Sequence, residues 1–183
     1  MESLAADLTT MIRTPLHEEH VARMREIGEV HAYPAGTTLC RFGDLSNTFY
    51  YVLAGEVEAV DGVTGERYAT STLGPAQFFG EISFLHGGNA MLGARTVQDS
   101  QILVVPREAL LSLMSQIPEM SDIIVSVFAA RRRRLLESNE AGLVLVGAEV
   151  SKVIREIGAF ALRNRIPVRS LSLDSAAAEK EIA

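Results

Sequence analysis

Glycine is concentrated in one part of this 183-residue chain, and its spacing constrains the fold more than any other feature. Ten of the 14 glycines lie between Gly36 and Gly93. The segments around and between them are short and rich in β-branched and aromatic residues, which favour strands. Many short strands separated by turns are typical of an antiparallel sandwich or a barrel-like roll. The sequence therefore predicts a mainly β domain whose clearest strands are residues 37–39, 48–53, 56–60 and 101–105.

Helical patterns flank this block of strands on both sides. Thr14 and Pro15 are suited to the N-cap and the first turn of a helix that precedes the strands. After the last strand, Pro106 begins a short apolar helical pattern and Pro118 begins a longer one. The predicted domain is therefore a β-roll that is flanked by helices.

Residues 143–183 have a different pattern. Residues 143–146 are a continuous apolar run, as in a strand that is buried on both faces. A helical pattern follows at residues 152–165, and residues 168–173 form a second predicted strand. Strand, helix and strand in about 30 residues make a βαβ unit, which is too small to bury a sheet by itself. The predicted organisation is an N-terminal segment (1–14), the roll with its closing helix (15–138) and an incomplete α/β segment (143–183).

Composition argues against several classes of function. Cys40 is the only cysteine, which excludes an internal disulfide, a redox dithiol and a cysteine-based zinc site within these residues. The four histidines lack metal-ligand spacing, so we expect no metal site. The 17 basic and 23 acidic residues give a net charge of −6, which does not favour DNA binding. No apolar run reaches about 18 residues and no secretory signal is recognisable, so we expect a cytoplasmic protein without a membrane span.

One stretch carries functional information. Residues Gln77–Leu85 read QFFGEISFL, and Tyr33–Thr37 and Val52–Val57 precede them. Together these segments resemble the cyclic nucleotide-binding domain, the β-roll that catabolite-activator transcription factors share with cyclic-nucleotide-dependent kinases and gated channels. The resemblance covers roughly residues 15–137. It implies a double-stranded, jelly-roll-like β-roll with an embedded short helix and a long closing helix, and it implies a cyclic nucleotide as the ligand.

The resemblance also implies which residues contact that ligand. In the family, the glutamate that matches Glu81 accepts a hydrogen bond from the ribose 2′-hydroxyl, and the residues that match Gly80 and Ile82 donate backbone N–H groups. A glycine before a short helix is suited to an anion, because free N–H groups then point at it. Another interpretation is that Gly80 only ends a strand. The predicted ligand-binding residues are Phe79, Gly80, Glu81, Ile82, Ser83, Ala90, Met91, Arg95 and Arg131.

The sequence departs from the family pattern where the phosphate is bound. The family normally has an arginine nine or ten residues after the cassette glutamate, followed by a small hydroxyl residue. This chain has Ala90 and Met91 at those positions, and the next arginine is Arg95. A missing charge-assisted contact costs about 1.5–3 kcal/mol, so we expect weak binding of cyclic AMP in the usual manner. One hypothesis is that Arg131, the first of four consecutive arginines, replaces the missing partner, and the other is that this run is a solvated helix end.

The segment after the roll indicates which kind of protein the roll would regulate. Transcription-factor members continue with a winged helix-turn-helix, whereas residues 143–183 have a strand–helix–strand pattern, which argues against DNA binding. This segment resembles the thioredoxin-like connection in bacterial flavoproteins that are similar to thioredoxin reductase and begin with a cyclic nucleotide-binding domain. The implied partner is a downstream catalytic domain or redox protein. Because the chain lacks the dithiol and flavin motifs, we predict that it is not an enzyme and has no cofactor of its own.

We therefore predict a non-catalytic, ligand-sensing regulatory module. The alternative is a degenerate, ligand-free roll that serves as a dimerisation or interaction scaffold for a redox flavoprotein. In that alternative, a homodimer forms through residues 118–137, whose apolar stripe includes Met120, Ile123, Ile124 and Val127.

Overall fold

The computed structural model describes most of the chain as two compact units. These units are Met1–Arg132 and Arg133–Ala183. The described residues are 13–62, 64–68, 72–80, 82–137, 143–148, 151–163, 168–175 and 178–179.

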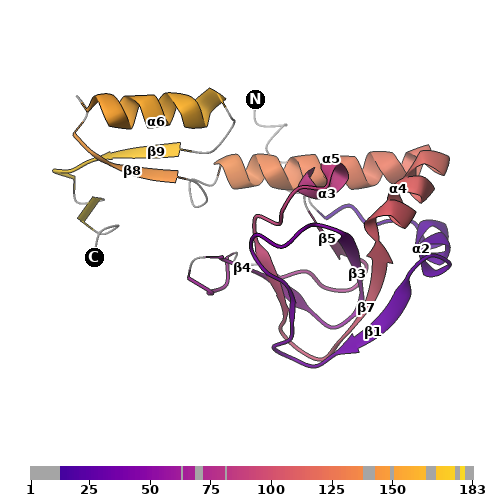
Figure 1. The fold of residues 1–183 in the computed structure, drawn as a ribbon. Helices are drawn as coiled ribbons and strands as arrows, with labels where there is room; N and C mark the ends of the chain where they lie inside the picture. Colours follow the sequence, from indigo (N-terminus) through magenta and orange to yellow (C-terminus); the bar gives the residue numbers. More distant parts are fainter. Residues whose placement is uncertain are drawn as a thin grey trace. The chain divides into compact units, whose positions relative to one another are not determined.

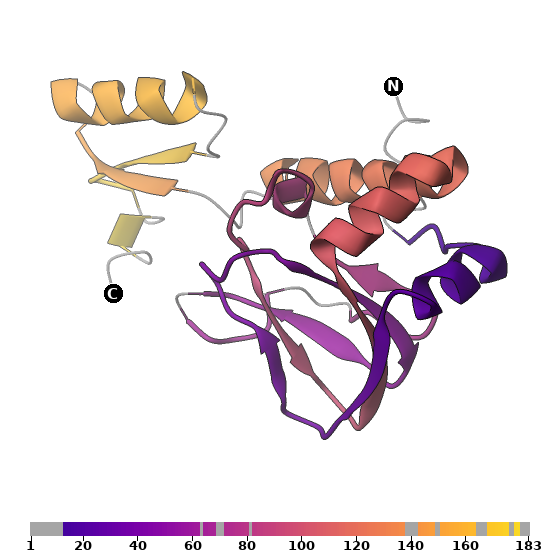
Figure 2. The same ribbon diagram turned by 45° about the vertical axis from the view of Figure 1, so that its right-hand side comes forward.

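Two antiparallel sheets form the body of the first unit (Figures 1 and 2). The larger sheet has the strand order β1-β7-β3-β5, and the smaller has the order β2-β6-β4. The four strands predicted most clearly are confirmed as β2, β3, β4 and β7. The strand bounds are β1 Glu29–Tyr33, β2 Thr38–Cys40, β3 Thr48–Ala54, β4 Val57–Val60, β5 Phe78–Phe79, β6 Gly93–Thr96 and β7 Ser100–Pro106.

The strand β3 of the four-stranded sheet is largely buried on both faces, and its successive side chains point to opposite sides. On β3, Phe49 and Tyr51 belong to a core cluster that includes helical residues, whereas Tyr50 and Val52 belong to a cluster with residues of the smaller sheet. The strand therefore has almost no polar residues, and its alternation separates two apolar cores. One core lies between the two sheets and the other lies under the helices.

In the described part of the first unit, four helices accompany the roll. They are α2 Glu18–Arg25, α3 Ile82–His86, α4 Arg107–Gln116 and α5 Pro118–Glu137. The predicted starts of the last two are confirmed, since Pro106 is the N-cap of α4 and Pro118 is the first residue of α5. Proline is suited to the first turn because its missing N–H would have no partner there.

The predicted start of α2 at Thr14 and Pro15 is wrong. His17 is the N-cap, and its backbone is extended, with φ −66° and ψ 152°. The helix therefore begins at Glu18, where two acidic side chains occupy the first turn. Acidic residues at this position interact favourably with the helix dipole, and no side chain caps the helix.

The long helix α5 packs on the roll with one apolar stripe. Met120, Ile124, Val127 and Phe128 are fully buried in the core that also contains Phe49 and Phe78. Continuing by one turn along this stripe leads to Arg131. The start of α5 is thus held by apolar contacts, and an arginine follows at the next inward position.

The second unit contains a parallel pair of strands and a helix (Figure 1). The strands β8 Leu143–Gly147 and β9 Val168–Ser172 pair in parallel, and α6 Lys152–Arg163 comes between them in the chain. The predicted strand–helix–strand order is therefore present, and its likeness to thioredoxin stays a prediction. The sequence around residues 138–142, which contains Ser138, Asn139 and Gly142, predicts a linker between the roll and this unit, and these residues lie outside the described ones.

One feature of α6 differs from the predicted pattern. The spacing of Val153, Ile157, Phe160 and Ala161 predicts one apolar stripe on this helix, but of these four only Ala161 is buried, and Val153 and Phe160 are 61% and 57% exposed. The side facing β8 instead contains Gly158, where an added Cβ would lie 3.8 Å from Cδ1 of Leu145. Ile154 also faces this strand, since an added Cβ at Gly147 of β8 would lie 2.9 Å from its Cγ1.

Candidate functional site

The predicted binding cassette begins where β5 ends. Phe78 and Phe79 form β5, and their side chains point to opposite faces of the sheet. The Phe79 ring stacks on Tyr50 in the core between the sheets, with ring centroids 4.4 Å apart and planes 5° apart. Phe78 packs in the other core, against Phe49 and Phe128. The strand that leads into the cassette is therefore anchored on both sides.

Gly80 is required by the packing of α5. Its φ of +147° favours glycine, and a Cβ atom at this position would lie 2.8 Å from Cζ of Phe128. The cassette backbone therefore contacts the closing helix directly. Glu81, the predicted ribose contact, lies outside the described residues, and the helix α3 begins at Ile82 with Ser83 next.

Arg107 holds the far end of α3, and the sequence analysis missed it. Its guanidinium donates hydrogen bonds from Nε to the carbonyl of Phe84 (2.5 Å) and from Nη2 to that of Leu85 (2.9 Å). Carbonyls at the end of a helix otherwise lack intrahelical partners, and a cation there also complements the dipole. No local pattern could have indicated this role, because the residues in contact are 22 and 23 positions apart.

Arg131 reaches the roll. Its Nη1 donates a hydrogen bond to the carbonyl of Phe78 at 2.6 Å, and its guanidinium carbon lies 5.3 Å from the centroid of the Phe78 ring. Burial, and secondly the nearby charge of Arg13, lower the pKa of Arg131 to about 10. The side chain is therefore still protonated at neutral pH. The structure brings one of the four arginines to the strand before the cassette, and contact with a ligand stays a prediction.

Ala90 and Met91 occupy the positions where the family has its phosphate contacts. The backbone of Ala90 is paired with the loop between β2 and β3: its N–H donates to the carbonyl of Asp44, and its carbonyl accepts from Gly43, both at 2.8 Å. Ala90 is buried, whereas Met91 is 38% exposed. Ala90 therefore has neither a charge nor a free backbone N–H group to offer an anion.

Arg95 is engaged in an ion-pair network. On β6 it stands opposite Glu58 of β4, and its Nε donates to Glu58 Oε1 at 2.8 Å. Arg67 donates to the other carboxylate oxygen at 2.6 Å. Because Ala94 faces the core between the sheets, the alternation along β6 directs Arg95 to the opposite face. Arg95 is therefore held by Glu58 on that face, and its predicted contact with a ligand stays a prediction.

The network predicts a pH dependence of stability. The hydrogen bond from Arg67 lowers the pKa of Glu58, burial acts in the opposite direction, and the hydrogen bond and charge of Arg95 lower it further. Because the pKa of Glu58 is lower in the folded than in the unfolded protein, its ionised carboxylate stabilises the fold. This contribution is complete at pH values above the ordinary pKa of 4.5. This contribution is lost as the pH falls through the lowered pKa.

We expect the Glu58→Gln variant to lose less stability than the wild type between pH 6 and pH 3, as measured by urea unfolding. Glu66→Gln is the matched control, because Glu66 is exposed and its backbone N–H and carbonyl groups make hydrogen bonds that the substitution keeps. Parallel pH profiles for the wild type and Glu58→Gln would contradict the network.

Two further observations concern other classes of site. Within the described ranges, no group of three histidine, cysteine, aspartate or glutamate side chains is arranged to hold a metal ion. None of the described helices is both long and apolar enough to cross a bilayer.

Comparison with known proteins relates the roll to a family. Residues 30–117 match the cyclic nucleotide-binding domain. A cyclic AMP receptor protein of Thermus thermophilus is 31% identical over 102 residues, which are 55% of this chain and 47% of that protein. A CRP-like cAMP-activated global transcriptional regulator of Mycobacterium tuberculosis is 27% identical over 128 residues, 68% of this chain and 57% of that protein. The chain spans about half the length of these curated relatives.

A solved structure agrees with the sequence matches. The crystal structure of the Thermus thermophilus catabolite activator protein has a TM-score of 0.57 and 28% identity, and the match covers 68% of this chain and 59% of that one. Residues 30–117, which match the family, run from β1 to the end of α4 and include the short helix α3. The first unit of this chain therefore has the fold of the cyclic nucleotide-binding domain.

Proposed function

We propose that the first unit is a ligand-sensing regulatory module that binds a cyclic nucleotide or a related phosphate ligand and catalyses no reaction. The fold supports this proposal, and so does the similarity to two relatives, a cyclic AMP receptor protein and a cAMP-activated regulator. The predicted contacts are the cassette residues Phe79 to Ser83, together with Arg131. Ala90 is left out of the polar contacts because its backbone is already paired.

The observation that carries the proposal is the double link between β5 and the closing helix. Gly80 lies against Phe128 of α5, and Arg131 of α5 donates to the carbonyl of Phe78. A ligand that displaces the cassette backbone must therefore change the packing of α5. In mechanistic terms, the ligand shifts the population between two packings of this helix, by as much as its affinities for the two packings differ.

Arg131 supplies the positive charge that the cassette lacks. It stays protonated at neutral pH, and its Phe78 contact places it beside the strand that enters the cassette. A guanidinium is suited to a phosphate because its N–H groups form charge-assisted, bidentate hydrogen bonds. To meet a phosphate, the side chain would keep its place on α5 and exchange the carbonyl for the ligand.

Calorimetric titration with cyclic AMP and cyclic GMP tests the proposal. We expect saturable binding of at least one nucleotide, and Arg131→Met to weaken it by about 10- to 100-fold, as for a lost charge-assisted contact. Arg132→Met removes the same charge one position along α5 and should leave the affinity unchanged. Arg131→Lys should restore part of it, and thermal unfolding of each variant separates lost binding from lost folding.

Two results would contradict the proposal. One is the absence of saturable heat with both nucleotides, which would favour the scaffold alternative. The other is an equal affinity for the Arg131→Met and Arg132→Met variants, which would remove Arg131 from the binding site.

The scaffold alternative needs a dimer contact other than the apolar stripe that the sequence predicts for residues 118–137. Met120, Ile124 and Val127 are fully buried against the roll. The prediction that these three side chains form a dimer contact is therefore wrong. Apolar side chains that already form the core of one molecule do not also cover a second one. A homodimer through residues 118–137 would have to use the outward side of α5, where Val125 is 39% exposed.

For the second unit, we propose the role of a thioredoxin-like connection to a downstream catalytic domain or redox protein. The parallel β8–β9 pair and the intervening α6 support a piece of an α/β domain. So does the exposure of Val153 and Phe160 on α6, because parallel sheets are normally covered on both faces within a larger domain.

A further inference from the structure

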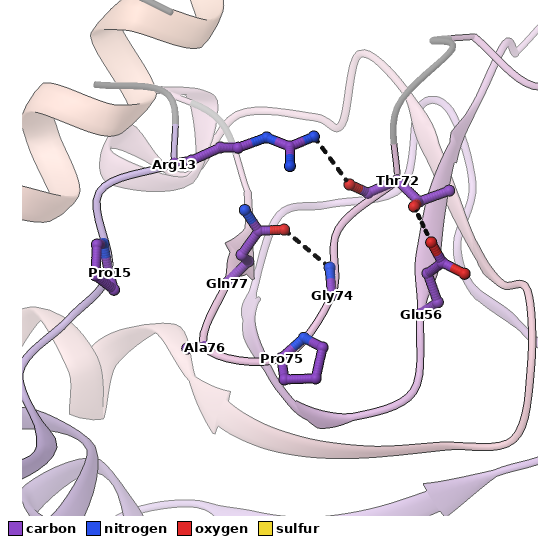
Figure 3. A pocket seen from close by; sticks show the side chains of 8 residues that line it. All are labelled: Arg13, Pro15, Glu56, Thr72, Gly74, Pro75, Ala76 and Gln77. Atoms are coloured by element: carbon purple, nitrogen blue, oxygen red, sulfur yellow. Dashed lines mark hydrogen bonds between the residues drawn. The ribbon is translucent and has the colours of Figure 1, made fainter. Parts of the chain in front are cut away.

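A separate hollow lies on the first unit beside the turn that leads into β5 (Figure 3). Its volume is about 430 Å³, a size suited to a small metabolite. It shares no residue with the predicted nucleotide contacts. Its lining residues come from four separate places in the chain, Arg13 and Pro15, Glu56, Thr72, and the turn Gly74, Pro75, Ala76 and Gln77.

Hydrogen-bond donors face this hollow from one side. Gln77 uses its side-chain oxygen to accept the N–H of Gly74 at 2.9 Å, which directs its amide nitrogen away from that bond (Figure 3). The exposed Arg13 makes one long hydrogen bond, from Nη2 to the carbonyl of Thr72 at 3.4 Å. Among the described residues, neither the other guanidinium N–H groups nor the Gln77 amide nitrogen has a further hydrogen-bond partner. A cation and an amide donor are therefore available at the same opening.

The described lining carries one positive charge, on Arg13, and one negative charge, on Glu56, so an anion is favoured on the Arg13 side of the hollow. The carboxylate of Glu56 already accepts a hydrogen bond from the Thr72 hydroxyl. Arg13 lies close enough to Arg131 for its charge to lower the pKa of that residue. Two cations so placed repel each other, and an anion bound at Arg13 would offset this repulsion.

The backbone of the turn is held in an unfavourable conformation. Ala76 has a φ of +64°, a region that residues with a Cβ atom rarely adopt. The turn is fixed by hydrogen bonds from Ala76 N to the carbonyl of Val52 and from Gln77 N to that of Gly74. Such strained positions are concentrated at ligand-binding turns, so an observed outlier supports a functional hypothesis.

We propose that this hollow binds a small oxyanion, a phosphate or carboxylate group, between the Arg13 guanidinium and the Gln77 amide nitrogen. The site is distinct from the cassette and does not depend on the proposed cyclic nucleotide. Its occupant is a small anionic metabolite, since the described lining offers a single cation, Arg13, and a single side-chain amide, that of Gln77.

Heteronuclear NMR titration of the full chain tests this site, with inorganic phosphate and with acetate at constant ionic strength. We expect saturable shifts of the backbone amides of residues 74–77 with at least one anion, and the two arms tell phosphate from carboxylate. Arg13→Gln should weaken binding about tenfold, and Glu56→Gln should strengthen it by removing a negative charge. Arg23→Gln, an exposed arginine outside the hollow, is the control for net charge.

Three outcomes would overturn the proposal. They are the absence of saturable shifts with both anions, shifts confined to residues 78–86 of the cassette, and equal affinities for Arg13→Gln and Arg23→Gln. Because Arg13 is exposed, its variant is expected to fold, and the dispersion of the NMR spectrum verifies this. Cyclic nucleotide binding is measured separately, so failure of one site leaves the other proposal intact.

Discussion

Replacing Phe128 with alanine is expected to lower the free energy of unfolding by about 3–5 kcal/mol. The side chain is fully buried, and its ring centroid lies 6.0 Å from that of Phe78, 6.3 Å from that of Phe84 and 6.4 Å from that of Phe49. These partners come from β5, α3 and β3, so the substitution leaves a cavity where three elements meet the closing helix. Urea unfolding followed by circular dichroism measures the loss.

Two comparisons make this prediction specific. Val125→Ala changes an exposed side chain on the same helix and should cost well under 1 kcal/mol. Gly80→Ala should cost less in the Phe128→Ala background than in the wild type, because the added Cβ would otherwise lie 2.8 Å from the Phe128 ring. A loss below 1 kcal/mol for Phe128→Ala would show that α5 does not pack on the roll as described.

Replacing Gly55 with alanine should lower the free energy of unfolding by about 2–5 kcal/mol. The φ of +91° at Gly55 costs a residue with a Cβ roughly 1–2 kcal/mol. The new Cβ would also lie 2.6 Å from Cα of Ser100, and overpacking adds about 1–3 kcal/mol. Ser100 has little room to move, because it begins β7, which pairs on both sides with β1 and β3.

Gly65 provides the matched control for this substitution. Its φ is +71°, and nothing lies within 4 Å of an added Cβ. Gly65→Ala should therefore show the backbone cost alone, about 1–2 kcal/mol. Thermal and urea unfolding of both variants give the difference, and equal losses would contradict the close contact between Gly55 and Ser100.

The regular elements of the fold were predictable where local chemistry decides them. The apolar and β-branched run at residues 48–53 became β3, since its composition suits burial on both faces of a sheet. Pro118 and the apolar period after it became α5. The strand β1 was not predicted, because its side chains are mostly exposed and its pairing with β7 joins residues about 70 positions apart.

The binding cassette was predicted only in part. The motif QFFGEISFL indicated the family, and the comparison confirms the fold. The motif does not show that Gly80 contacts Phe128 or that Arg107 holds the carbonyls at the end of α3. These contacts join residues separated by 48 and 23 positions, and nothing in the local sequence distinguishes them from other pairs.

The sequence alone determined the types of element, their order and the absence of an arginine at the usual phosphate position, because these follow from propensity, periodicity and residue identity. Only the tertiary structure decided which acceptor each arginine meets: Arg95 meets the carboxylate of Glu58, Arg131 the carbonyl of Phe78, and Arg13 the carbonyl of Thr72. Charged side chains act over a few ångströms, and the folded backbone sets those distances. An arginine in the sequence therefore shows only that a positive charge is present. The fold determines whether that arginine stabilises a strand, supports a helix or is available to a ligand.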